Sequence, residues 1–328
     1  MRDCGISVLE QYELDVYSTR RIRGAVLCDT DRGLFLLKEV PRAAARFPVL
    51  EEVYRKLQEN GLTMTDIPLK NREGALVSCA ADGTSYMVKK WFQGRECDVR
   101  RESELKEASR QLARIHQALH FGAEWMPAGP PPLAEEFERH SRELRKVRNF
   151  IRRRSLKGEF EYAFLQAFDE MYSWAETARE RLEKSRTEEL RQKALEGGDV
   201  IHGDYNYHNI LICPQGIAVT CFEHAHRDIQ LADFYYFLRK TLEKNRFDER
   251  TGYQMMRGYD SVLTLGKVQR EYLAIRLCYP EKFWKTANTY FHSSKAWIPA
   301  KNVEKLQLCV AQNKEKKKFL ENLFAFHF

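Results

Sequence analysis

The sequence predicts an α+β protein of two lobes, a small antiparallel β-sheet carrying one helix followed by a larger, mainly helical region. Short apolar runs separated by turn residues dominate from Tyr12 to about Phe92, whereas amphipathic helical patterns dominate after Gly94. We therefore expect an N-terminal lobe over residues 1–93 and a C-terminal lobe over residues 94–328.

The strands of the first lobe follow from its apolar runs and turns. Residues 23–28 and 34–40 are apolar-rich and flank DTDRG (Asp29 to Gly33), a pattern typical of a β-hairpin. Two further runs, 75–80 and 85–92, are joined through ADG. Together they predict a small sheet with one helix inserted after its third strand.

The helices follow from apolar spacing and from their end residues. In the first lobe, VLEEVYRKLQEN predicts a helix that begins at Pro48 and ends at Asn60-Gly61. In the second, apolar residues recur at helical spacing from Leu105 to Leu119. The prolines of MPAGPPPL (126–133) predict a loop, and charged helices are expected from Ala134 to Glu196.

Composition bounds the class of protein. The 328 residues include 43% hydrophobic residues, enough for a sizeable core, and 54 basic against 47 acidic residues give a net charge of +7. The eight cysteines show no CxxC pair, which favours reduced thiols and synthesis in the cytoplasm. Because no run approaches about 18 apolar residues, we expect no membrane span.

The segment IHGDYNYHNILI (201–212) carries the pattern H-x-D-x-x-x-x-N of a kinase catalytic loop. In that chemistry a carboxylate such as Asp204 receives the proton of a substrate hydroxyl, while an amide such as Asn209 holds a metal ion. His202 is expected to pack and hydrogen-bond the loop backbone rather than to react.

The first lobe offers partners for a nucleotide. Lys38, in the strand LFLLKEV, can reach from the sheet to phosphate groups, and Glu51 or Glu52 on the next helix could pair with it. No glycine-rich loop is present: STRRIRG (18–24) holds one glycine and three arginines, so phosphate contacts there would depend on arginine side chains.

The whole chain resembles the aminoglycoside-phosphotransferase branch of the kinase-like fold, and within it the CotS family of spore coat proteins. The resemblance is carried by FLLKEV, YMVKKWFQGRECDV, QLARIHQA, VIHGDYNYHNIL, DIQLADFYYFLRKTLEK and YPEKFWKTANTYFHSSKAW. It implies a two-lobed kinase-like fold, association with the bacterial spore coat, and an ATP-dependent activity.

The resemblance also implies roles for single residues. Lys38 matches the phosphate-binding lysine, Asp204 the catalytic base and Asn209 a metal ligand, while Asp233 matches the buried aspartate that braces the catalytic loop. The hinge between the lobes, where the backbone holds adenine, would contain Trp91, Phe92 and Gln93.

One position departs from the family pattern. Related kinases place a magnesium-binding aspartate before an aromatic residue, whereas this chain has TCFE with Cys221 at that place. A neutral thiol is a poor ligand for Mg²⁺. Glu223, two residues on, could supply a carboxylate instead, and Asp228 lies further along the loop.

Two functions remain open from the sequence. The first is a phosphotransferase that uses ATP and Mg²⁺ and acts on a hydroxyl of a small molecule, a sugar or polysaccharide, or a coat component. The second is a catalytically degenerate pseudokinase that serves as a scaffold and binds other spore coat proteins. The acceptor is not identified. Acceptor pockets in this fold are built from helical insertions that vary between proteins, here at about 127–196.

Two further interpretations are less favoured. Cys221, His224 and His226 could ligate zinc, but no second cluster completes a tetrahedral site. The basic run from Arg145 to Arg154 could meet an anionic partner such as a nucleic acid, yet a solvated helix face explains it more simply. We therefore expect no nucleic-acid partner.

Overall fold

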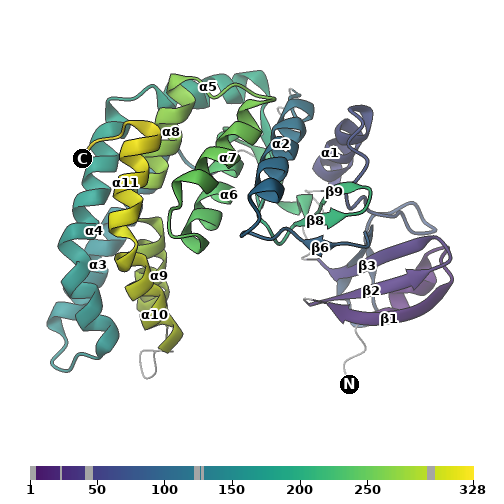
Figure 1. Cartoon of the computed structure of the whole chain (residues 1–328). Helices are drawn as coiled ribbons and strands as arrows, with labels where there is room; N and C mark the ends of the chain where they lie inside the picture. Colours follow the sequence, from purple (N-terminus) through teal and green to yellow (C-terminus); the bar gives the residue numbers. More distant parts are fainter. Residues whose placement is uncertain (1–4, 23, 41–46, 122–125, 127–128, 294–299) are drawn as a thin grey trace.

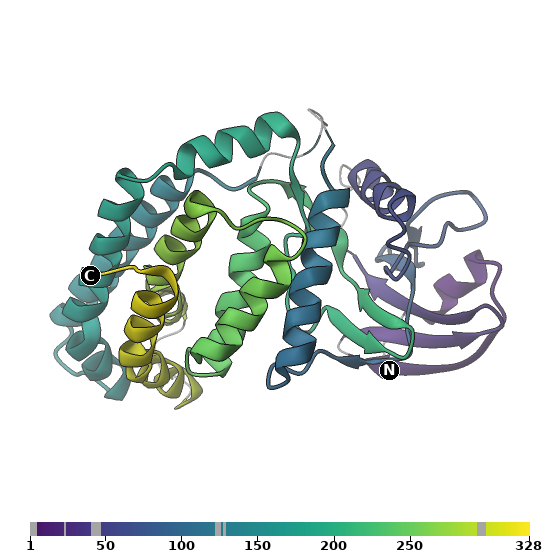
Figure 2. The ribbon, with the colours of Figure 1, turned by 45° about the horizontal axis from the view of Figure 1, so that its top comes forward.

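The computed structural model describes residues 5–22, 24–40, 47–121, 126, 129–293 and 300–328. Two lobes lie side by side, a small one built around a β-sheet and a large one built mainly of helices (Figures 1 and 2). The fold class that the sequence predicts is thus confirmed.

The small lobe contains a five-stranded sheet in the order β1-β2-β3-β5-β4, in which all neighbouring strands are antiparallel. Its strands are β1 (Val16–Ile22), β2 (Ala25–Thr30), β3 (Gly33–Glu39), β4 (Ser78–Cys79) and β5 (Ser85–Lys90). β2 and β3 form the predicted hairpin, with Thr30 opposite Gly33.

Alternation along β3 separates the two faces of this sheet. Phe35 and Leu37 join a core cluster with Val8 and Leu9 of the short helix η1 (Ile6–Gln11). Lys38 has the opposite orientation, because successive side chains of a strand point to opposite faces. Its ammonium reaches Glu223 of the large lobe.

Helix α1 (Phe47–Glu59) belongs to the small lobe in sequence but packs into the core of the large one. Its apolar side chains Val53 and Leu57 share a buried cluster with Leu105 and Leu112 of α2 (Glu102–Ala118). Apolar contacts therefore connect the lobes on the side of α1.

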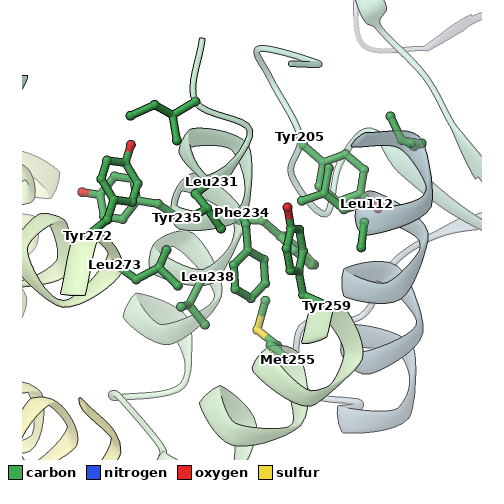
Figure 3. Packing of buried hydrophobic residues seen from close by; sticks show 14 of the residues in the cluster. Leu112, Tyr205, Leu231, Phe234, Tyr235, Leu238, Met255, Tyr259, Tyr272 and Leu273 are labelled. Carbon is green, nitrogen blue, oxygen red and sulfur yellow. The ribbon is translucent and has the colours of Figure 1, made fainter. Parts of the chain in front are cut away.

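The large lobe consists of amphipathic helices around α6 (Leu231–Lys244). Figure 3 shows Phe234 and Leu238 of α6 packed between Tyr259 of α7 and Leu273 of α8. The other helices are α3 (Leu133–Arg153), α4 (Glu159–Glu183), α5 (Thr187–Gly197), α7 (Glu249–Asp260), α8 (Lys267–Cys278), α9 (Glu281–His292), α10 (Ala300–Ala311) and α11 (Asn313–Phe324). This packing fixes α6, the helix that carries Asp233.

Short strands hold the loops between the two lobes. The hairpin of β8 (Ile210–Cys213) and β9 (Gly216–Val219) pairs with β6 (Arg95–Glu96), and β7 (Val200–Ile201) pairs with β10 (His226–Arg227). Residues 202–209 and 220–225 are therefore anchored at both ends. The lobe boundary at residues 93–94 stays a proposal, placed where the chain leaves β5 and enters β6.

Some predicted elements differ in extent. The strand expected at 75–80 is reduced to Ser78–Cys79, because the side chain of Asn71 accepts hydrogen bonds from the backbone N–H groups of Glu73 and Ala75 and closes a turn there. Parts of the loop at 126–133 and of the block at 279–297 lie outside the described residues. Among the helices described, none combines the length and the apolar character needed to cross a membrane.

Candidate active site

The loop that begins at His202 is braced by a buried carboxylate on α6. The Asp233 carboxylate accepts hydrogen bonds from the backbone N–H groups of His202 at 2.6 Å and Gly203 at 2.9 Å. Burial alone would raise the pKa of Asp233, but the hydrogen bond from His116 and the nearby histidines outweigh it, so the pKa is lowered. Asp233 therefore holds the loop as an ionised group.

Gly203 is required at the second position of this loop. Its φ is +83°, and a Cβ atom built there would lie 2.2 Å from the backbone oxygen of His224. The catalytic-looking loop and the segment after Cys221 therefore touch backbone to backbone, which a larger residue would prevent.

His202 ties the same two segments together through its ring. Its Nε2 donates to the backbone oxygen of Thr220 at 2.9 Å, while its Nδ1 accepts from the backbone N–H of Asp204 at 3.1 Å. Burial lowers the pKa of His202, which agrees with a neutral ring. The geometry places this side chain on backbone groups, away from any reacting atom.

Two amides orient the Asp204 carboxylate. Asn206 donates to Oδ1 and Asn209 to Oδ2, each at 2.9 Å. Since Asn209 uses its amide nitrogen here, its amide oxygen is left for another partner. Tyr236 of α6 lies close by: burial, together with the charge of Asp204, raises the pKa of Tyr236 to about 12.

Cys221 follows β9 in the left-handed conformation, with φ 73° and ψ 50°. Its backbone N–H donates to Oδ2 of Asp66 at 2.8 Å. Burial, reinforced by the charges of Asp66 and Glu223, raises the pKa of the Cys221 thiol to about 11. At neutral pH the side chain is therefore an uncharged thiol.

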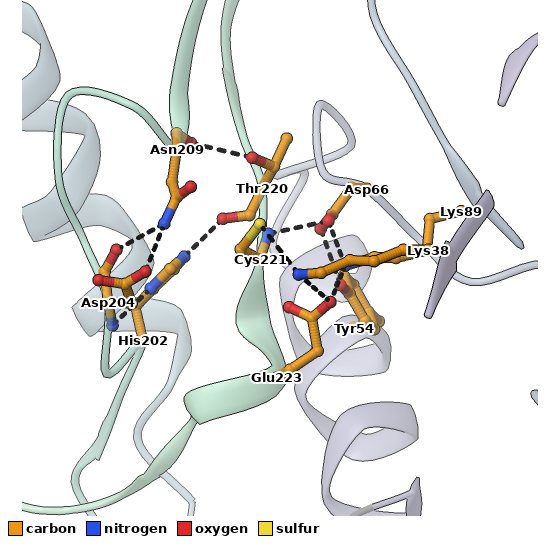
Figure 4. Close-up of polar contacts among 10 residues, drawn as sticks. All are labelled: Lys38, Tyr54, Asp66, Lys89, His202, Asp204, Asn209, Thr220, Cys221 and Glu223. Carbon is orange, nitrogen blue, oxygen red and sulfur yellow. Dashed lines mark hydrogen bonds and ion pairs between the residues drawn. The ribbon is translucent and has the colours of Figure 1, made fainter. Parts of the chain in front are cut away.

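A cluster of four charged residues surrounds Cys221; we call Lys38, Asp66, Lys89 and Glu223 the charge cluster (Figure 4). Lys89 Nζ forms ion pairs with Asp66 and, at 2.8 Å, with Glu223. Lys38 Nζ lies 3.3 Å from the same Glu223 oxygen and 3.9 Å from the sulfur of Cys221. The formal charges of two ammonium groups and two carboxylates cancel.

The charge cluster is largely removed from water. The side chains of Lys89 and Asp66 are 1% and 0% exposed, whereas that of Lys38 is 36% exposed. Burial would raise the pKa of Glu223, but the two lysine charges outweigh it and hold the pKa at about 2. Correspondingly, the nearby carboxylates raise the pKa of Lys89 against the effect of its burial.

The pairing expected between Lys38 and Glu52 needs correction. Glu52 accepts hydrogen bonds from Arg55, one helical turn along α1, and Glu51 pairs with Lys70. Lys38 pairs with Glu223 instead. The physical reason is the orientation of α1. Its apolar face packs against the large lobe, so Glu51 and Glu52 pair with cations near their own helix.

The expected hinge residues line a cleft between the lobes. Trp91, Phe92 and Gln93 border a cavity of about 430 Å³ with Leu27 and Leu34 of the sheet and Leu211 of β8. Arg20 of β1 also lines it, so the arginine-bearing segment that replaces a glycine loop faces this space. Apolar side chains from both lobes in this cavity suit a planar ring such as adenine.

The residues expected to hold Mg²⁺ do not form a matching ligand set. Asn209 retains its amide oxygen, but Cys221 offers a neutral thiol and the Glu223 oxygen Oε1 already accepts from two ammonium groups. Magnesium prefers oxygen ligands in octahedral geometry and binds thiols poorly. A Mg²⁺ ion held by Cys221 and Glu223 therefore does not fit these side chains.

The other sequence proposals near this site find different partners. His226 Nδ1 contacts the backbone oxygen of His224, and the metal-capable group found among the described residues is Asp66, Cys221 and Glu223. Asp228 accepts from the backbone N–H of Ile229 and does not belong to that group. In the basic run, Ile151 is fully buried, as expected for a packed helix stripe.

Asp66 and Lys89 were missed by the sequence analysis. Lys89 lies two residues after the buried Met87 in an apolar strand. Since alternate residues of a strand share a face, Lys89 is on the same buried face of β5. A charged residue at such a position requires a buried partner, which is the one indication the sequence offers. Its partner Asp66 lies 23 positions earlier in an irregular segment, and nothing local marks it.

Solved structures with the same fold include phosphotransferases. An aminoglycoside phosphotransferase from Alicyclobacillus acidocaldarius subsp. acidocaldarius DSM 446 superposes with a TM-score of 0.87 at 21% identity, over 97% of this chain and 94% of that one. Spectinomycin phosphotransferase APH(9)-Ia, solved with ADP and spectinomycin, gives a TM-score of 0.60 at 13% identity, over 94% and 97% of the two chains. The chain therefore has the kinase-like aminoglycoside-phosphotransferase fold.

A third structure has the same fold with a nucleotide analogue and a metal bound. It is the amicoumacin kinase hAmiN in complex with AMP-PNP, Ca²⁺ and its ligand, at a TM-score of 0.60 and 10% identity, over 95% of this chain and 92% of that one. Among curated proteins, none matches this chain.

The particular family is identified by a family model described as "Spore coat putative kinase YutH", which matches residues 6–323. The chain belongs to this family. The expected aminoglycoside-phosphotransferase-like fold is confirmed, whereas the family that matches is the YutH family and the sequence analysis named CotS.

Proposed function

We propose that the chain is an ATP-dependent phosphotransferase of the spore coat that transfers a phosphoryl group to a hydroxyl. The observation that carries this proposal is the position of Asp204, held at both carboxylate oxygens by Asn206 and Asn209. Its loop is braced by Asp233. A base with this support matches the part that kinases use to orient and deprotonate an acceptor.

The proposed reaction is a single displacement at phosphorus. The acceptor oxygen forms a bond to the γ-phosphorus as the bond between that phosphorus and the bridging oxygen breaks, and ADP leaves with the electron pair. The proton of the acceptor hydroxyl passes to the carboxylate of Asp204. Asn206 and Asn209 keep that carboxylate in place during the transfer.

The nucleotide would lie in the interlobe cleft. We propose that adenine fills the space between Leu27, Trp91 and Leu211, while Arg20 and Lys38 contact the phosphates. Lys38 is partly exposed and can turn from Glu223 towards an anion. No position at Cys221 and Glu223 is assigned to Mg²⁺, since those side chains do not fit it.

The comparisons support an acceptor class and a location for this activity. We propose a hydroxyl-bearing small molecule or polysaccharide as acceptor, and the spore coat as the place of action, with other coat proteins as partners. The family description supports the location, and the aminoglycoside and amicoumacin kinases support a hydroxyl acceptor.

The test is ATP consumption with a panel of polyols, amino sugars and coat polysaccharide. The wild type should consume ATP with at least one acceptor. Asp204→Asn should lower the rate by about 10²–10⁴-fold, because it removes the proton acceptor, while ATP still binds. Asp169→Asn on the surface of α4 is the control and should keep full activity. Equal rates for wild type and Asp204→Asn would contradict the proposal.

A second candidate function is a pseudokinase scaffold, and the Cys221 thiol is the observation that favours it. On that alternative, the fold binds coat partners and the wild type binds ATP without turnover on every acceptor. The variant Cys221→Asp discriminates the two. If it gains turnover that the wild type lacks, the natural chain is catalytically degenerate.

A further inference from the structure

Lys89 lies among three side chains whose ligand atoms are close enough to hold one metal ion. Asp66, Cys221 and Glu223 each present a ligand atom, and these atoms all lie within 4.8 Å of one another, the size of one coordination sphere. The ammonium of Lys89 pairs with both carboxylates of this group. A cation is therefore already present among the ligand atoms, and it is covalently part of the chain.

The charge cluster has no excess negative charge to attract a divalent cation. Its two carboxylates are neutralised by the two ammonium groups of Lys38 and Lys89. Tyr54 donates to the remaining oxygen of Asp66 at 2.8 Å, and the backbone N–H of Cys221 donates to Oδ2. Both oxygens of the Asp66 carboxylate thus already have donors, which come from α1, β5 and the Cys221 segment.

Displacing Lys89 would be costly. Its side chain is 1% exposed, so a metal ion that took over Asp66 and Glu223 would leave a buried ammonium without a partner. Breaking a buried ion pair by removing one partner is strongly destabilising, because it leaves an uncompensated buried charge. A Mg²⁺ ion would in addition lose tightly held water for a neutral thiol.

We infer that the ammonium of Lys89 replaces the divalent cation at Asp66, Cys221 and Glu223, so that this chain binds a nucleotide without a metal ion at that position. The inference rests on the proposed nucleotide site. Lys38, the exposed member of the charge cluster, is the group that a phosphate reaches, while Lys89 keeps the two carboxylates neutral behind it.

The first test titrates ADP into the wild-type protein in EDTA and then in Mg²⁺, using calorimetry. The Kd should differ between the two conditions by less than about threefold. A Kd that tightens by tenfold or more with Mg²⁺ would overturn the inference, since the metal would then bridge protein and phosphates.

The second test needs no nucleotide. Lys89→Met keeps the length of the side chain but removes its charge, leaving two carboxylates and a thiol around an empty centre. Mn²⁺ alone, followed by electron paramagnetic resonance, should bind this variant at least about tenfold more tightly than the wild type. Lys90→Met, the exposed neighbour on β5, should bind Mn²⁺ as the wild type does.

Two results separate the inference from the proposed function. If ADP binds under neither condition, the proposed function fails, and the Mn²⁺ titration alone decides the inference. Equal Mn²⁺ affinity in wild type and a folded Lys89→Met would overturn it. If Lys89→Met does not fold, Mn²⁺ titration of the wild type beside Glu223→Gln decides: the same Mn²⁺ affinity in both supports the inference, and a loss in Glu223→Gln overturns it.

Discussion

Gly203 connects the conformation of one residue to the shape of the whole site. Its positive φ lets the loop turn towards Asp204, and the absence of a side chain lets the backbone of His224 approach. The same turn donates two backbone hydrogen bonds to Asp233. A single methyl group is therefore enough to separate the two segments that build the site.

Gly203→Ala is expected to destabilise the protein by about 2 kcal/mol or more beyond the cost of the same change at Gly61. Both glycines have positive φ, +83° and +75°, but a Cβ at Gly61 meets nothing within 4 Å. Gly61→Ala thus isolates the backbone strain, and the difference between the variants isolates the clash with His224. Urea unfolding measures both values, and equal losses would contradict the contact.

Whether Glu223 can replace the metal ligand that is missing at Cys221 depends on the residues around both. The thiol removes a metal ligand, and Glu223 has the carboxylate that could replace it, but two lysines already hold that carboxylate. The sequence shows the substitution and the possible substitute. It does not show the two lysines converging on one oxygen, which is a property of the tertiary structure.

At the scale of elements, the parts with local patterns were predictable. The hairpin of β2 and β3, the amphipathic α2 and the end of α1 before Asn60-Gly61 all follow from residue spacing and turn residues. The partners of α1 could not be predicted, because its apolar stripe fits either lobe. Glu51 or Glu52 was expected to pair with Lys38 from the kinase pattern, but Glu52 pairs with Arg55 and Glu51 with Lys70.

His140 is a buried histidine at the contact between α3 and α9, and the sequence alone did not single it out. His140 is 3% exposed and stacks on Trp284, with ring centroids 3.4 Å apart. Burial, aided by the charge of Arg139, lowers the pKa of His140 to about 4. The folded protein thus holds a neutral ring where an unfolded chain would be protonated below its ordinary value of 6.5.

This histidine predicts a pH dependence of stability. As the pH falls from 6.5 towards 4, the unfolded chain binds a proton that the folded one does not, so the contribution to stability is lost. His140→Phe keeps the stacking without the charge. The free energy of unfolding of the wild type minus that of the variant should fall by up to about 3 kcal/mol between pH 7 and pH 4.

The control for this effect is His292→Phe at the exposed end of α9. The comparison needs guanidinium unfolding curves of the three proteins at each pH. A difference between wild type and His140→Phe that stays constant over this range would show that the ring titrates alike in both states.

At the scale of the whole molecule, the site is assembled from both lobes. The small lobe supplies Lys38 and Lys89, and the large lobe supplies Asp204, Cys221 and Glu223, with the ion pairs between them crossing the interface (Figure 4). Apolar contacts of α1 with α2 also connect the lobes, and Tyr54 of α1 reaches Asp66 of the charge cluster. The cleft at Leu27 and Leu211, which we propose for the nucleotide, also has walls from both lobes.

The most direct test of the account is calorimetric titration of ATP into the wild type, Lys38→Met and Lys70→Met. The account predicts saturable binding of one ATP to the wild type, binding at least about tenfold weaker in Lys38→Met because a phosphate contact is lost, and wild-type binding in Lys70→Met, whose exposed lysine pairs with Glu51. Absence of saturable binding by the wild type, or equal affinity in Lys38→Met, would contradict the assignment of this cleft to a nucleotide.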